Sequence, residues 1–176
     1  MERIAELPPR LKARIAGVFY LLTILTGLYA ALFASGSPRL VANLIGTVFY
    51  VVVTLIFYDL FKPVNKGLSL LAAAFSLVGC AVTFLGLFHV RSPHLNSLVF
   101  FGFYCLLLGY LIFKSNFLPR TLGVLVAIAG LGWLTYLSPA LAGRLSTYTI
   151  ITGLIGEGSL TLWLLVFGVK PERRHS

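Results

Sequence analysis

The run "YTIITGLIGEGSLTLWLLVFGV", residues 148–169, decides the fold class of this chain. At 1.5 Å per residue, a helix of this length crosses the ~30 Å hydrocarbon core of a bilayer. Five earlier runs have similar length and apolar character, at residues 15–33, 40–61, 68–90, 95–113 and 118–137. Backbone polar groups in hydrocarbon must pair within their own segment, so the six runs predict six transmembrane helices.

Composition supports a membrane protein. Hydrophobic residues make up 59% of the chain and charged residues 11%, whereas a soluble domain has about 25% charged residues. We therefore expect an all-α polytopic protein with a basic tail at 1–14, a six-helix domain at 15–169 and a second tail at 170–176. The first run exceeds the roughly 7–15 residues of a signal-peptide core, which favours a retained helix.

The distribution of positive charge predicts the orientation. The net charge is +9, but Lys and Arg lie in the tails and in the short gaps between runs rather than in a basic groove, which excludes nucleic acid as the partner. Eleven of the 14 Lys and Arg residues fall on the side that carries both tails, and only Arg39, Arg91 and Arg144 fall on the other. The positive-inside rule therefore predicts that both termini are cytoplasmic.

Four segments together resemble a known family. They are "ARIAGVFYLLTILTGLYA" at 13–30, "LFKPVNKGLSLLAAAFSLVG" at 60–79, "LLLGYLIFKSNFLPRTLGVLVAIAGLGWL" at 106–134 and "GEGSLTLWLLVFGV" at 156–169. These segments are similar to a bacterial six-helix membrane family catalogued as a domain of unknown function. The resemblance implies a multi-pass protein of the bacterial inner (cytoplasmic) membrane, and it supplies no activity, substrate or catalytic residue.

Glu157 is the principal candidate for a functional residue. If the last helix begins near Tyr148, Glu157 lies nine to ten residues into it, close to the bilayer midplane. An ionised carboxylate there costs at least ~2.5–3.5 kcal/mol on insertion scales. Glu157 is therefore protonated, exposed to water in a cavity, or paired with a bound cation. Helical phase places it with Thr149, Gly153 and Gly156 on the face that packs into the bundle.

Three residues in other runs are candidate partners of Glu157. Tyr104 lies at a similar depth and is expected to hydrogen-bond a protonated Glu157, while Thr26 and Thr83 are weaker candidates. Two interpretations stay open. The carboxyl group either belongs to a site for a ligand, proton or cation, or it stabilises a contact between helices, worth about 0.6 kcal/mol.

Charged residues also mark the expected cytoplasmic interface. Asp59 precedes Lys62 by three residues, a spacing that allows an ion pair at the end of the second helix. Lys62, Lys66, Lys114 and Arg120 form a set able to contact lipid headgroups.

The outer connection at 89–94 carries His89, Arg91 and His94, which have the chemistry to bind an anion or, poorly, a metal. Zinc needs three or four ligands, so we expect no metal site and no cofactor. Cys80 and Cys105 fall inside apolar runs and are interpreted as buried free thiols.

Three classes of function remain. The first is binding or transport of a small molecule, proton or cation through a pocket around Glu157. For transport, a chain this short is expected to form a homodimer. The second class is a structural or accessory subunit of a membrane complex, which docks through stripes of small residues such as Gly123, Ala127 and Gly130. An intramembrane enzyme is the weakest, because no second acid, base or nucleophile accompanies Glu157.

Overall fold

Six long helices form most of the computed structural model, which describes residues 7–88 and 96–169. They are α2 (Pro9–Leu32), α3 (Gly36–Phe61), α4 (Lys66–Leu87), α5 (Ser97–Lys114), α6 (Arg120–Leu134) and α7 (Pro139–Val166), with a 3-10 turn, η1 (Thr135–Leu137), between α6 and α7. With η1 counted as part of α6, each helix is long and apolar enough to cross a membrane. The predicted all-α fold with six membrane-spanning helices is confirmed.

Local signals in the sequence start several of these helices. The side-chain oxygen of Asn65 accepts a hydrogen bond from the backbone N–H of Leu68 at 3.0 Å, and Asn96 caps α5 through Leu98 in the same way. Each bond satisfies one of the backbone donors that the first turn of a helix leaves unpaired. Asn65 lies in a connection that we predicted from composition, whereas Asn96 lies just inside the run predicted at 95–113.

Four helices start earlier than predicted, two of them by six residues or more. α2 begins at Pro9, inside the segment expected to be the tail, and α7 begins at Pro139 rather than near Tyr148. The prediction of a connection at 138–144 was wrong because proline is favourable in the first turn of a helix, where its missing N–H has no partner to lose. Glu157 is consequently 18 residues from the start of α7, and its depth cannot be counted from Tyr148.

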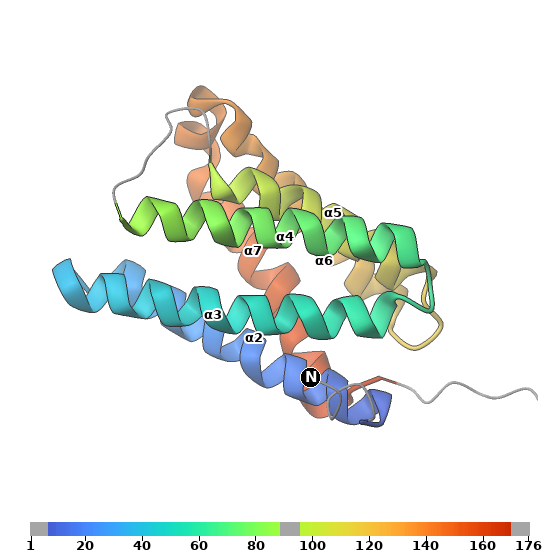
Figure 1. Cartoon of the computed structure of the whole chain (residues 1–176). Coiled ribbons are helices and arrows are strands. Elements are labelled where there is room, and N and C mark those ends of the chain that lie inside the picture. Colours follow the sequence, from blue (N-terminus) through green and yellow to red (C-terminus); the bar gives the residue numbers. More distant parts are fainter. Residues whose placement is uncertain (1–6, 89–95, 170–176) are drawn as a thin grey trace, which may run out of the picture.

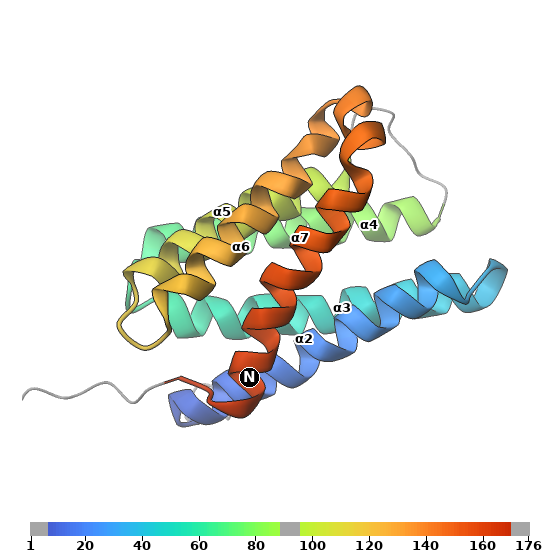
Figure 2. The same ribbon diagram turned by 180° about the vertical axis from the view of Figure 1, so that it is seen from behind.

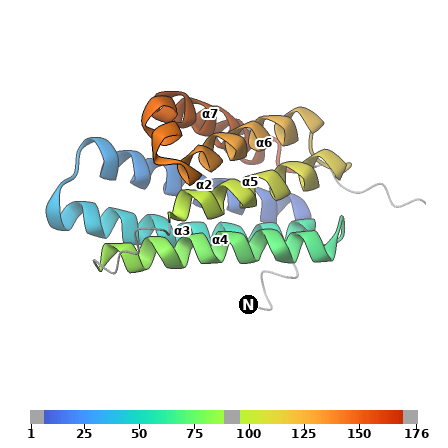
Figure 3. The ribbon, with the colours of Figure 1, turned by 90° about the horizontal axis from the view of Figure 1, so that it is seen from above.

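The helices pack as a closed ring. Each contacts its neighbours in sequence, and α7 contacts α2 to close the circle. Viewed from above, α3 and α4 lie along one edge and α6 and α7 along the other, with α2 and α5 between them (Figure 3). α7 is inclined relative to α3 and α4 (Figure 2), which accommodates its greater length within the bundle.

The ring has two unlike ends. The terminal end carries the starts of α2, α4 and α6 and the end of α7, where the guanidinium of Arg14 donates to the carbonyl oxygen of Val166 at 3.1 Å. Close packing continues inward from there, since a Cβ at Gly17 would lie 3.0 Å from the backbone nitrogen of Leu165. Toward the opposite end, α2 and α3 diverge from α6 and α7 (Figure 1). The tightly packed core therefore lies toward the terminal end.

Candidate functional site

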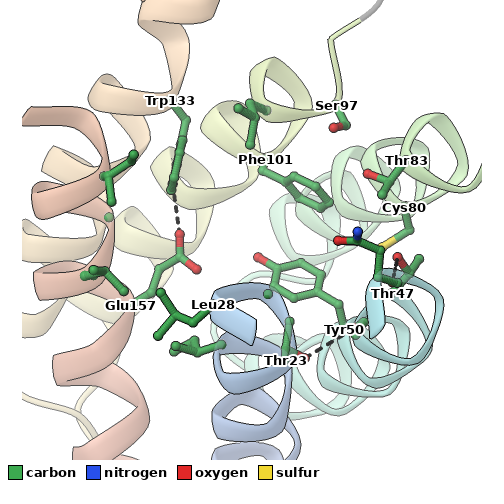
Figure 4. A pocket seen from close by; sticks show the side chains of 18 of the residues that line it. Thr23, Leu28, Thr47, Tyr50, Cys80, Thr83, Ser97, Phe101, Trp133 and Glu157 are labelled. Atoms are coloured by element: carbon green, nitrogen blue, oxygen red, sulfur yellow. Dashed lines mark hydrogen bonds between the residues drawn. The ribbon is translucent and has the colours of Figure 1, made fainter. Parts of the chain in front are cut away.

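A pocket of about 390 Å³ lies among the helices in the half of the bundle away from the terminal end. All six helices contribute to it (Figure 4). Its lining is mostly apolar and aromatic, and it includes Thr23, Leu28, Thr47, Tyr50, Thr83, Phe101, Trp133, Leu154 and Glu157. The ring therefore encloses a site that no single pair of helices could form.

Glu157 lies in this pocket and is held by hydrogen bonds from three different helices. The hydroxyl of Tyr20 on α2 donates to Oε2 at 2.9 Å, and the indole N–H of Trp133 on α6 donates to Oε1 at 2.9 Å. The thiol of Cys105 on α5 lies 3.9 Å from Oε1. Tyr50 on α3 points its hydroxyl toward Glu157 across the pocket (Figure 4). Both carboxyl oxygens thus accept, and the carboxyl group is fixed in position.

Glycines beside Glu157 make this geometry possible. A Cβ at Gly153 would lie 2.5 Å from the indole of Trp133, so only glycine lets that ring lie against α7 and reach the carboxyl group. A Cβ at Gly156 would lie 2.6 Å from the carbonyl oxygen of Leu125 on α6. Gly158 has nothing within 4 Å. Of the two glycines that flank Glu157 in the sequence, only Gly156 therefore permits a close approach of the neighbouring helix.

The phase of α7 agrees with the prediction. Thr149, Gly153 and Gly156 are buried, whereas Ile151 and Ile155 on the opposite face are about half exposed. That exposed face is apolar, as a lipid-facing surface requires.

The three predicted partners of Glu157 are not the residues that contact it. Thr83 lines the pocket, but its hydroxyl donates to the carbonyl oxygen of Gly79 at 2.9 Å. Thr26 donates to the carbonyl oxygen of Leu22 at 2.8 Å and packs against Gly46. The expected hydrogen bond between Tyr104 and Glu157 was wrong. The Tyr104 hydroxyl is buried and has no hydrogen-bond partner among the described residues.

Tyr20 and Trp133 are the partners that the sequence did not identify. Tyr20 and Tyr104 both lie near the middle of a span, so depth alone cannot distinguish them. The order of the helices around the ring distinguishes the two tyrosines, because α7, which carries Glu157, packs directly against α2, which carries Tyr20. The sequence did not indicate Trp133 as a partner of Glu157, because tryptophan near the end of a span is typical of the membrane interface.

The predicted ion pair at the terminal end is present, and it has an additional member. Asp59 pairs with Lys62, as its spacing indicated, and also with Lys12, whose side chain is only 10% exposed. The hydrogen bond to Asp59 raises the pKa of Lys62 above its usual range. Asp59 thereby joins the start of α2 to the end of α3, a link across 47 residues that no local pattern indicates.

Other predicted charges lie at the same end but outside the pocket. Lys114 lies over the ring of Tyr110 and Arg120 over the ring of Phe113, at 5.8 and 5.6 Å from the ring centres. Lys66 is exposed at the start of α4. His89, Arg91 and His94 lie outside the described residues. Cys80 and Cys105 are buried free thiols, as predicted.

Comparison with known proteins agrees with the resemblance noted in the sequence. A protein of Archaeoglobus fulgidus described as "Uncharacterized protein" is 33% identical over 129 residues, which cover 68% of this chain and 77% of the relative. No solved structure matches the chain. Residues 38–97 and 92–168 match the family described as "Domain of unknown function (DUF4386)", and the chain, a multi-pass helical membrane protein, belongs to that family.

Proposed function

We propose that this protein binds a small molecule in the pocket at Glu157, as the recognition step of transport across the cytoplasmic membrane of a bacterial cell. The observation that supports this is a carboxyl group in a cavity of about 390 Å³ lined by all six helices. Ligand sites are typically apolar cavities with a few directed polar groups. A packing contact between helices would account for the hydrogen bonds of Glu157, but it requires no cavity.

The position of the pocket favours transport over a purely structural role. Toward the terminal end, fully buried side chains such as Leu108, Leu160 and Leu164 fill the space between the helices. A site accessible from one side of a bundle and closed toward the other is one of the two states that alternating access requires. With the terminal end in the cytoplasm, as the Lys and Arg distribution predicts, this pocket lies in the outer half of the bundle.

A pocket-filling substitution tests the proposal. Gly27 lines the pocket and has no neighbour within 4 Å of an added Cβ, so Gly27→Leu narrows the cavity without a backbone clash. Gly86 has the same open surroundings and is outside the pocket, which makes Gly86→Leu a matched control. We would measure the thermal stabilisation of the purified protein by three small aromatic probes: benzyltrimethylammonium, neutral neopentylbenzene and phenylacetate.

At least one probe should stabilise the wild type and Gly86→Leu and lose most of its effect on Gly27→Leu. Equal stabilisation of all three proteins, or of none, would contradict a ligand pocket. An accessory subunit, the alternative function, predicts insensitivity to the probes together with a fixed partner that copurifies with the protein.

A further inference from the structure

We infer that the pocket is selective for a monovalent organic cation with an apolar body, such as a hydrophobic amine; this inference rests on the proposed function. The first argument is charge. Among the described residues that line the pocket, Glu157 is the sole Asp, Glu, Lys, Arg or His. The described lining therefore holds a carboxylate and supplies no basic side chain to neutralise it. A bound cation would provide the missing charge where hydrocarbon makes an unpaired carboxylate costly.

The hydrogen bonds to Glu157 favour its ionised form. The indole N–H of Trp133 is a donor only, and it is directed at Oε1, with the thiol of Cys105 near the same oxygen. Tyr20 donates to the other oxygen. An ionised carboxylate accepts at both oxygens, whereas a protonated one needs an acceptor for its own hydrogen. These donors stabilise a negative charge on Glu157, whereas a protonated carboxyl group would give its hydrogen to the Tyr20 hydroxyl oxygen, which can also accept.

Three threonines of the pocket present acceptor oxygens. The hydroxyl groups of Thr23, Thr47 and Thr83 each donate their hydrogen to the carbonyl oxygen four residues earlier, at 3.0, 2.8 and 2.9 Å. Each donation leaves oxygen lone pairs for a ligand. These three oxygens suit a ligand that carries donors or positive charge.

Aromatic rings supply the second element that a cation site uses. Tyr50, Phe101 and Trp133 all line the pocket, and the rings of Tyr50 and Phe101 meet edge to face with centres 5.0 Å apart. The faces of such rings attract alkylammonium groups. Leu28 and Leu154 line the cavity on the side of α2 and α7 and offer an apolar surface for the rest of the molecule.

Isosteric probes separate charge from shape. Benzyltrimethylammonium and neopentylbenzene differ by a nitrogen in place of a carbon, so one is cationic and the other neutral. We would titrate each into the purified protein in uncharged detergent and measure the dissociation constants calorimetrically. We expect the wild type to bind the cation at least about tenfold more tightly than the neutral probe, and phenylacetate more weakly than both.

Two substitutions of Glu157 and a control complete the test. Glu157→Gln should bring the affinities for the cationic and the neutral probe to within about twofold, whereas Glu157→Asp, which keeps the charge, should retain the preference for the cation. Asp59→Asn removes one negative charge at the terminal end, outside the pocket. It should keep the full preference even where it lowers the unfolding temperature, which separates lost binding from lost stability.

The outcomes distinguish this inference from the proposed function. Suppose that the neutral and the cationic probe bind equally to the wild type and that neither binds to Gly27→Leu. This result would overturn the selectivity for a cation, and the pocket would remain a ligand site. A preference for the cation that survives Glu157→Gln would also overturn it. Absence of any binding that depends on Gly27 would overturn both.

Discussion

Tyr20 and Tyr104 are both buried within the bundle, but only Tyr20 contributes a hydrogen bond to Glu157. Tyr20→Phe should lower the free energy of unfolding by about 1 kcal/mol, since it removes a donor from the carboxyl group. Tyr104→Phe should cost nothing, because the hydroxyl that it removes has no partner among the described residues. Thermal unfolding of both variants in the same detergent measures the difference.

Equal losses of stability in the two variants would mean that the Tyr104 hydroxyl also has a stabilising partner.

At the scale of single residues, the sequence predicted which carboxyl group matters but not which side chains bind it. Glu157 stands out by composition alone, as an acidic residue in an apolar run. Its partners come from helices that are distant in sequence, and Tyr104 has the same residue type at a similar depth. Only the closure of the ring distinguishes them.

At the scale of helices, Gly156 and Gly158 flank Glu157 but differ in surroundings. Gly156→Ala should destabilise the protein by about 1–3 kcal/mol, because its Cβ would lie 2.6 Å from the carbonyl oxygen of Leu125 and push α6 from α7. Gly158→Ala, with open space around it, should raise stability by about 0.5–1 kcal/mol through helix propensity. Chemical or thermal unfolding of the pair tests this contact, and a harmless Gly156→Ala would show that the two helices are not closely packed there.

The same element shows why helix boundaries were only partly predictable. α3 ends at Phe61, just before Pro63, as the sequence indicated. α7, in contrast, extends through "SPALAGR", which has the composition of a turn. Proline and serine start helices as well as end them, so composition identifies a boundary but not the side on which the helix lies. The distinction depends on the packing of the neighbouring helix.

At the scale of the molecule, the number of helices and their order follow from the six apolar runs. The pocket does not, because it lies where α2 and α3 diverge from α6 and α7 toward one end (Figure 1). That separation depends on which faces touch. Small residues allow α5 and α6 to pack so closely that a Cβ at Gly109 would lie 2.6 Å from the carbonyl oxygen of Gly123. The sequence identified such stripes as packing faces, but it did not predict the cavity that results from the packing.

The orientation of the ring determines from which side the pocket is reached, and it can be measured directly. Asn116 is exposed in the connection between α5 and α6 at the terminal end, and Ala140 is exposed at the start of α7 at the other. Cys80 and Cys105 are buried, so their background labelling should be low. A membrane-impermeant maleimide should label Ala140→Cys in intact cells and Asn116→Cys only after permeabilisation, because eleven of the 14 basic residues lie on the side of Asn116. The reverse pattern would place the pocket in the cytoplasmic half of the bundle, so that the proposed transport would begin with recognition of an internal ligand.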